Sequence, residues 1–313
     1  MALGSAGCSS ASGPGADGGS MGQEFPCTEQ GIRDAIVEGG GPHTFACDGP
    51  TRLMTESEIV VDHDVTLDVA SRLTVDGGGA HLVLSVAEGV DAELRGFTVT
   101  NGNGGIRNMG TLTVTHCTVS GNYRLGVGGG LYNAGTMMLV GTTVAENTAE
   151  DQGGGIFNSY GTLVVTNTTV SGTIYAEGGP GENVVAVVAS VGTVVSGEPG
   201  SSPGCFGTPQ DIGPNEWVSD GYNIEVGGDS CGFDTTGDQI NVSAEALNLG
   251  PLADNGGPTM THALGAGSVA IDWIPEADCV DADGQPVTTD QRGQPRPETD
   301  GTICDVGAFE VQA

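Results

Sequence analysis

The chain repeats itself every 25 residues between Gly104 and Thr173. Gly-Ile-Arg-Asn at 105–108 returns as Gly-Leu-Tyr-Asn at 130–133 and as Gly-Ile-Phe-Asn at 155–158. Gly-Thr follows each copy, at 110–111, 135–136 and 161–162. A fixed period of this size indicates an array of stacked structural units.

Within each repeat, apolar residues alternate with polar ones, which is the pattern of a strand with one buried face. The alternating pairs are Leu112 and Val114, Met137 and Leu139, and Leu163 and Val165. Glycine pairs or triplets interrupt every unit, so no window is long enough for a helix. Short strands joined by tight bends fit such a unit, and we predict an all-β fold, a single-stranded right-handed parallel β-helix.

Equivalent residues of successive repeats should lie in contact, one coil above the next, about 4.8 Å apart. Asparagines at a bend would then form a hydrogen-bonded ladder of Asn108, Asn133, Asn158 and Asn183. Two aliphatic stacks would form the core: Leu112, Met137 and Leu163, and Val119, Val144 and Val170. Each such side chain contributes about 1.5–3 kcal/mol when fully buried, and one repeat cannot bury this face alone.

The repeats divide the 313 residues into three parts. Residues 1–22, rich in Ser, Gly and Ala, are expected to form a flexible tether or the remainder of a lipoprotein signal. Residues 23–247 are assigned to the β-helix, with its clearest repeats at 104–173. Residues 248–313 hold few repeats and many Asp, Gly and Pro, and are predicted to form an irregular C-terminal cap.

One short helix is predicted at about 28–38, because Thr28 can cap its start and glycines from Gly39 stop it. Ile32, Ala35 and Ile36 form a single apolar stripe on this helix. The open end of a solenoid exposes unpaired strand edges and apolar core. We therefore expect the helix to cover the N-terminal end.

The charge of the chain is strongly unbalanced. Forty acidic residues stand against eight arginines, without a single lysine, and the formal net charge is −32. This charge repels phosphate groups and anionic lipids, so nucleic acid is not expected as a partner. No apolar run reaches the length of a membrane-spanning helix. Ser-Ala-Gly-Cys, which ends at Cys8, resembles the end of a bacterial lipoprotein signal and makes Cys8 a candidate for a lipid anchor.

Six of the eight cysteines fall into local pairs: Cys27 with Cys47, Cys205 with Cys231, and Cys279 with Cys304. None of them has the Cys-x-x-Cys spacing of zinc or redox sites. We predict three structural disulfides and an oxidising compartment outside the cytoplasm. Cys117 stands where other repeats have Thr142 and Thr168, and is predicted to be a small buried residue.

Several motifs resemble those of bacterial surface proteins. One segment resembles the opening of right-handed parallel β-helix repeat proteins: residues 94–102, Leu-Arg-Gly-Phe-Thr-Val-Thr-Asn-Gly. The repeats of polymorphic outer-membrane proteins resemble the units of the sequence Gly-Gly-Gly-(Leu/Ile)-(Tyr/Phe)-Asn. Residues 221–310 are similar to the choice-of-anchor Q domain, with matching motifs at 250–259, 290–293 and 304–310. The resemblance implies a pectin-lyase-like solenoid that is secreted or displayed at the cell surface, as an outer-membrane lipoprotein for example, with no established activity.

A hydrolase on this fold would need carboxylates that converge on one face, about 5–10 Å apart. Asp62, His63 and Asp64 form the densest ionisable cluster at a strand end, and they are the candidates for acid–base catalysis or calcium binding. The alternative is a solvated turn before the next strand. A lyase would need a strong base, and Arg107 and Arg124 are the bases that the central coils offer.

Calcium is the cofactor for which the sequence offers a motif. Asp278, Asp281 and Asp283 resemble an oxygen-rich calcium loop, without the glutamate that would stand at its twelfth position. The alternative is a hydrophilic loop bounded by a disulfide.

The repeat array thus provides a complete scaffold, and the sequence shows no convergent catalytic set. We expect an exported or cell-surface β-helix that acts as a structural, adhesive or binding module, with extracellular polysaccharide or another surface protein as its partner. The alternative is a polysaccharide lyase, hydrolase or epimerase on the same fold, dependent on calcium.

Overall fold

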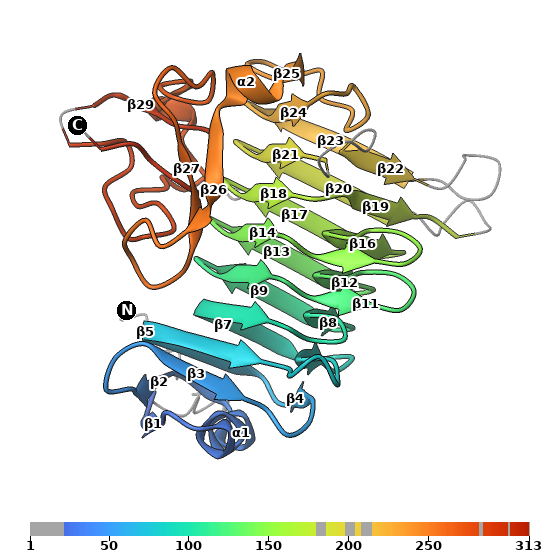
Figure 1. Ribbon diagram of the computed structural model, residues 1–313, viewed down its shortest axis with the longest axis vertical. Coiled ribbons are helices and arrows are strands. Elements are labelled where there is room, and N and C mark those ends of the chain that lie inside the picture. Colours follow the sequence, from blue (N-terminus) through green and yellow to red (C-terminus); the bar gives the residue numbers. More distant parts are fainter. Residues whose placement is uncertain are drawn as a thin grey trace, which may run out of the picture.

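The computed structural model describes residues 22–179, 186–197, 204–207, 215–281, 284–299 and 301–312, with the backbone alone at Ala70 and Ser71. The chain folds as a parallel β-solenoid of about six turns, consistent with the predicted right-handed β-helix. Figure 1 shows the solenoid upright, with its N-terminal end at the bottom. Cys8 lies outside the described residues.

The turns of the solenoid stack their strands into three faces, and the strands within each face pair in parallel. Face 1 holds β2 (Gly40–Ala46), β9 (Thr111–Thr115), β13 (Thr136–Val140), β17 (Thr162–Thr166), β20 (Ala186–Val191) and β23 (Asn215–Gly221). Face 2 holds β3 (Thr51–Met54), β10 (Thr118–Ser120), β14 (Thr143–Ala145), β18 (Thr169–Ser171), β21 (Val194–Ser196), β24 (Ile224–Val226) and β25 (Gln239–Val242). Face 3 holds β4 (Ile59–Val61), β6 (Leu84–Val86), β8 (Ile106–Asn108), β12 (Leu131–Asn133), β16 (Ile156–Ser159), β19 (Ile174–Glu177) and β22 (Cys205–Gly207).

Two long strands join faces 1 and 2, so both faces belong to one sheet. These strands are β5 (Val65–Asp76) and β7 (Asp91–Thr100), and each runs along face 1 and then along face 2. Beside face 3, β11 (Tyr123–Arg124) and β15 (Thr148–Ala149) form a short separate pair.

The core is built from the stacks that the repeat predicts. Leu112 pairs with Met137 and Met137 with Leu163, while Val144 pairs with Val119 and Val170. All six side chains are fully buried. Equivalent positions of successive repeats therefore lie on adjacent strands, one turn apart.

Asparagines form a buried ladder along face 3. Asn108 Nδ2 donates to Asn133 Oδ1 at 2.8 Å, and Asn133 Nδ2 donates to Asn158 Oδ1 at 2.7 Å. The ladder ends there, because Ala176 of β19 is the register partner of Asn158. The next coil reaches face 3 directly after β18, without the glycine-rich loop of earlier turns, so the 25-residue step does not hold at this turn. Asn183 itself lies outside the described residues.

The predicted helix covers the N-terminal end of the core. Helix α1 spans Glu29–Glu38 after β1 (Glu24–Pro26), and Thr28 Oγ1 accepts a hydrogen bond from Gly31 N at 3.0 Å. Ile32, Ala35 and Ile36 are buried in the same cluster as the solenoid core. Figure 1 shows the helix below β2 and β4.

The C-terminal segment, residues 248–312, differs from the expected cap in its position. From α2 (Ala244–Leu247) at the far end of the solenoid, it turns back and runs along the side of the solenoid, as the orange and red ribbon of Figure 1 shows. It contains β26 (Leu249–Ala253), β27 (Thr261–Leu264), β28 (Ile274–Pro275) and β29 (Ile303–Cys304). The far end of the core is covered instead by the loop between β24 and β25, where Cys231 and Phe233 join the buried cluster.

Three disulfides are present, as predicted. Cys27–Cys47 lies beside α1, Cys205–Cys231 lies at the far end of the core, and Cys279–Cys304 lies within the C-terminal segment. Cys117 is a free, buried cysteine. Within the described ranges, neither helix has the length and apolar character needed to cross a bilayer.

Candidate binding cleft

A column of threonines runs along the outer side of face 2. Thr74, Thr98, Thr118, Thr143 and Thr169 are register partners on five successive strands. The residue after each threonine is a buried valine of the core. Because side chains alternate along a strand, the threonine hydroxyls lie on the outside.

The C-terminal segment covers the last three threonines of this column. Its contacts are Thr118 Oγ1 to the Met260 carbonyl at 2.6 Å, Thr143 Oγ1 to Gln291 Oε1 at 2.6 Å, and Ala308 N to Thr169 Oγ1 at 3.1 Å. Gln291 is fully buried, and its amide group also donates to the Cys117 carbonyl at 2.9 Å. The Asp-Gln-Arg-Gly motif at 290–293 therefore holds the segment against the solenoid.

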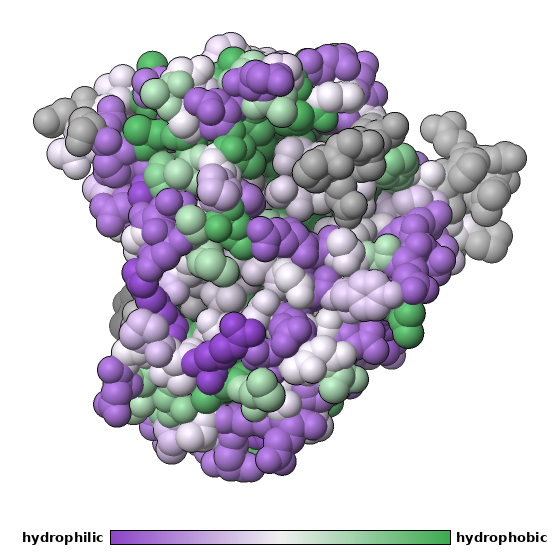
Figure 2. All heavy atoms as spheres, in the orientation of Figure 1, coloured by the Kyte–Doolittle hydropathy of each residue, from purple (hydrophilic) through white to green (hydrophobic). Residues whose placement is uncertain are grey.

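The first two threonines, half-buried Thr74 and buried Thr98, line the floor of a cleft of about 380 Å³. The walls come from β3, from β5 and β7, and from the loop that joins β26 to β27. The lining residues are Pro50, Thr51, Arg52, Arg72, Thr74, Thr98, Thr100, Asp254, Gly257, Pro258, Thr259 and Met260. Figure 2 shows strongly hydrophilic residues over β5 and β7, beside the lower end of the C-terminal segment.

Arg52, in one wall of the cleft, forms an ion pair with Asp76, which is buried behind it. Arg52 Nε donates to Asp76 Oδ2 at 2.5 Å. Asp76 Oδ1 also accepts from Gly78 N and from the Asn101 amide, both at 2.8 Å. Burial alone would raise the pKa of Asp76, but these hydrogen bonds and Arg52 outweigh it and hold the pKa below its usual value. The Asp76 carboxylate is therefore ionised at neutral pH.

A second ion pair, between Arg72 and Asp254, joins the solenoid to the C-terminal loop. Arg72 donates to Asp254 through both terminal nitrogens, with the Nη2–Oδ1 distance at 3.1 Å, and its Nε donates to the Gly257 carbonyl at 3.0 Å. The backbone N–H of Gly256, and then Arg72, lower the pKa of Asp254. Both side chains remain about half exposed, so a ligand can reach them.

The groups at the cleft are able to form hydrogen bonds with a ligand. Threonine hydroxyls both donate and accept, guanidinium groups donate, and ionised carboxylates accept. A glycosidase needs a carboxylic acid whose pKa is raised so that it can protonate the leaving group. Asp76 and Asp254 have lowered pKa values, the opposite of this requirement.

The Asp62, His63 and Asp64 cluster lies elsewhere, in the exposed turn between β4 and β5. His63 Nδ1 lies 2.9 Å from Asp62 Oδ1, and Asp64 Oδ1 accepts from the backbone N–H of Asp91 at 2.8 Å. None of these three residues lines the cleft. Among the described residues, no group of three or more His, Cys, Asp and Glu is arranged to hold a metal ion. A catalytic or calcium-binding role for this cluster stays a prediction.

The predicted calcium residues lie in the C-terminal segment. Asp278 Oδ2 accepts from the Tyr222 hydroxyl at 2.6 Å, a hydrogen bond that raises the pKa of Tyr222 to about 12. Asp281 Oδ1 accepts from Gln285 N at 2.8 Å. Asp283 lies outside the described residues. Calcium binding therefore also stays a prediction.

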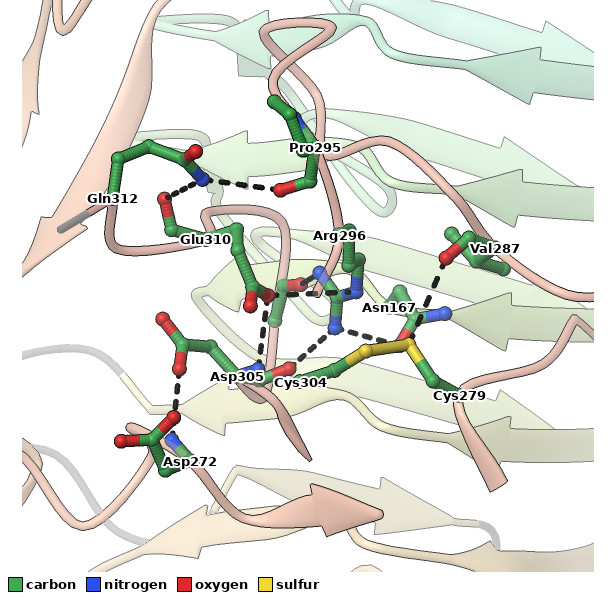
Figure 3. The surroundings of a disulfide bond; sticks show 11 residues. Asn167, Asp272, Cys279, Val287, Pro295, Arg296, Cys304, Asp305, Glu310 and Gln312 are labelled. Carbon is green, nitrogen blue, oxygen red and sulfur yellow. Dashed lines mark hydrogen bonds and ion pairs between the residues drawn. A yellow bond between two sulfur atoms is a disulfide. The ribbon is translucent and has the colours of Figure 1, made fainter. Parts of the chain in front are cut away.

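A buried charge cluster lies where the C-terminal segment meets the solenoid (Figure 3). Arg296 donates through Nη1 to the Gly307 carbonyl at 2.7 Å and through Nη2 to Asn167 Oδ1 at 3.0 Å, and its Nε lies 3.8 Å from Glu310 Oε2. Burial raises the pKa of Glu310 to about 7 and also raises that of Asp305. Arg296, Asp305 and Glu310 are at most 3% exposed, so this cluster serves the fold and not a ligand.

Sequence reasoning did not identify the residues of the cleft. The threonine column has a signal, because Thr118, Thr143 and Thr169 open the second strand of each clear repeat. Because the chain has only eight cationic side chains, all of them arginine, each arginine is also a candidate for a specific role. The pairing of Arg72 with Asp254 joins residues 182 positions apart, and no periodicity indicates it.

Neither a protein-family model, nor a curated protein, nor a solved structure matches the chain.

Proposed function

We propose that this β-helix is an extracellular binding module that holds part of a polysaccharide chain in the cleft between face 2 and the C-terminal segment. The observation that carries the proposal is the cleft itself. Its threonine floor is flanked by two guanidinium–carboxylate pairs whose side chains are already held in place.

The size and the rigidity of the cleft support binding. Its volume lies at the lower end of the range of small-ligand sites, about 300–1,000 Å³. The floor belongs to adjacent strands of a continuous sheet, and Asp76 is fixed by three neighbours. Such a site loses little conformational entropy when a ligand binds.

An extracellular location is part of the proposal. Three disulfides agree with an oxidising compartment. We retain as proposals the resemblance of residues 221–310 to choice-of-anchor Q domains and the lipid attachment at Cys8, and each would agree with display at a cell surface.

Binding is tested with the purified protein and a panel of soluble polysaccharides, by titration calorimetry and by retardation in gels that contain each polysaccharide. We expect binding without release of new reducing ends or of ultraviolet-absorbing unsaturated products. Arg72→Ala should weaken binding by about 10- to 100-fold, the cost of losing a charged hydrogen-bond donor.

Arg95→Ala is the matched control. Arg95 has the same exposed fraction as Arg72, 42%, and is also paired with a carboxylate, Glu93, but it lies on face 1 away from the cleft. Equal losses of affinity in both variants, or product release by the wild-type protein, would contradict the proposal.

A further inference from the structure

We infer that the cleft selects a neutral, hydroxyl-rich glycan and rejects an acidic one. This inference rests on the proposed function and adds the chemical class of the ligand. It follows from the charge balance of the cleft, from the field of the whole chain and from the donors and acceptors that the lining offers.

The charges at the cleft balance once Asp76 is counted, which pairs with the lining residue Arg52 although it does not line the cleft itself. The two arginines of the lining, Arg52 and Arg72, are paired with Asp76 and Asp254, and the other lining residues are Thr, Pro, Gly and Met. An anionic ligand would therefore meet guanidinium groups whose charge is already balanced. To gain a full ion pair it would have to displace a carboxylate of the protein.

Neither carboxylate is easily displaced. Asp76 is 1% exposed and accepts hydrogen bonds from Gly78 N, Asn101 and Arg52. Asp254 accepts from Arg72 through two parallel contacts, and paired contacts of this kind are among the stronger hydrogen bonds of proteins.

The electrostatic field of the whole chain also disfavours an acidic ligand. A formal charge of −32 repels a polyanion before it reaches the cleft. A neutral chain does not meet this barrier, so the field itself discriminates between the two classes.

The polar groups of the cleft match a neutral sugar. A guanidinium group has five N–H donors, and Arg72 uses three of its nitrogens toward Asp254 and Gly257, each through one N–H. The Arg72–Asp254 pair thus presents donors beside exposed acceptors, which suits sugar hydroxyls that donate and accept at once. Arg52 adds donors alone, because its partner Asp76 is buried. Thr74, Thr98 and Thr100 add further hydroxyls.

The cleft also offers apolar surface. Met260 is 36% exposed, and Pro50 and Pro258 line the same space. These side chains suit the C–H faces of a pyranose ring.

The experiment divides the panel into neutral polysaccharides (dextran, mannan, laminarin, xyloglucan and galactan) and acidic ones (polygalacturonate, alginate and hyaluronate). Affinities are measured from about 0.05 to about 0.5 M NaCl, where the Debye length falls from roughly 14 to roughly 4 Å. We expect binding within the neutral set, with affinity that changes less than about twofold with salt. The acidic set should bind at least tenfold more weakly at low salt.

Asp254→Asn tests the charge balance directly. Asp254 is half exposed, and the change leaves Arg72 with an unbalanced charge at the cleft. Affinity for the neutral ligand should fall, while affinity for polygalacturonate should rise and become weaker with added salt. Asp68→Asn makes the same change of net charge beside Arg95 on face 1 and should leave both affinities unaltered.

Tighter binding of an acidic polysaccharide by the wild-type protein, weakened by salt, would overturn the inference and leave the proposed function standing. Equal responses of the Asp254 and Asp68 variants would also overturn it. Absence of binding to both sets would overturn the proposed function itself. Thermal melting of each variant verifies that it is folded.

Discussion

Asn133 occupies the centre of the buried ladder and forms hydrogen bonds on both sides. Its Nδ2 donates to Asn158 Oδ1 at 2.7 Å and to the Thr162 carbonyl at 3.0 Å, while its Oδ1 accepts from Asn108 Nδ2 at 2.8 Å. The side chain is fully buried, so water does not replace a lost partner. Each residue of the ladder therefore satisfies backbone and side-chain groups of the neighbouring turns.

Asn133→Ala should lower the free energy of unfolding by about 2–4 kcal/mol, because it removes these bonds and leaves buried partners unsatisfied. Chemical denaturation followed by far-ultraviolet circular dichroism measures the change. Thr113→Ala, on the half-exposed outer side of face 1, is the control and should cost less than about 0.5 kcal/mol. A cost for Asn133→Ala no larger than that of the control would refute the structural role of the ladder.

Residue contacts within the repeats could be predicted because the 25-residue period places equivalent residues on adjacent strands. Residues 25 positions apart became neighbours, as Val119 and Val144 did. The same rule does not hold after Asn158, because the next turn lacks the glycine-rich loop and Ala176, 18 positions further on, takes the register position. Contacts that depend on no repeat, such as Arg72 with Asp254, were beyond the reach of the pattern.

Among the elements, α1 has a role that its length alone would not indicate. Its apolar stripe closes the core at the end where the first turn would otherwise expose it. Ile36 is 2% exposed, whereas its neighbour Val37 is 68% exposed. The two residues share a helix and differ in the side that they face.

Ile36→Ala should cost about 2–5 kcal/mol, because it removes apolar contacts and leaves a cavity against the first turn. Val37→Ala should change stability by less than about 0.5 kcal/mol. Thermal denaturation, together with binding of an apolar dye to the exposed core, measures both. Similar melting temperatures for the two variants would show that the helix does not close the core.

The helix α1 could be predicted because the residues that begin it, end it and form its buried side are all close together in the sequence. Thr28, the apolar stripe and Gly39 marked both ends and the buried side of α1 within eleven or so residues. The covering of the far end depends on Cys231 and Phe233 in an irregular loop, which carries no periodic signal. Residues 248–312 were therefore expected at an end, although they lie along the side.

For the molecule as a whole, the C-terminal segment acts as a brace across several turns. Its polar contacts with the solenoid include those of Gln291 and Arg296. Its own apolar residues form a second cluster with Val194 and Ile224 of face 2. The brace also forms one wall of the cleft, so its attachment and the binding site are physically linked.

The pH dependence of stability reports on this attachment. Burial raises the pKa of Glu310 from 4.5 to about 7 in a cluster with Arg296 and Asp305. A group whose pKa is higher in the folded state stabilises fully below its unfolded value and loses this contribution as the pH rises through its folded value. The contribution of Glu310 is thus present near pH 4.5 and lost above about pH 7. Partly buried His116 and buried His262, whose pKa values are lowered by desolvation, act in the opposite direction.

Comparison with Glu310→Gln isolates this contribution, because glutamine does not titrate and the histidines are common to both proteins. The wild-type protein should gain stability relative to the variant as the pH falls from about 8 to about 5, by on the order of 2–3 kcal/mol. Urea denaturation at a series of pH values measures the difference, and hydrogen exchange locates it in residues 284–299 and 301–312. Because Asp76 and Asp254 have lowered pKa values, they stay ionised across this interval. If the stability of the wild-type protein relative to Glu310→Gln is constant with pH, or grows as the pH rises, Glu310 does not have a raised pKa in the folded C-terminal segment.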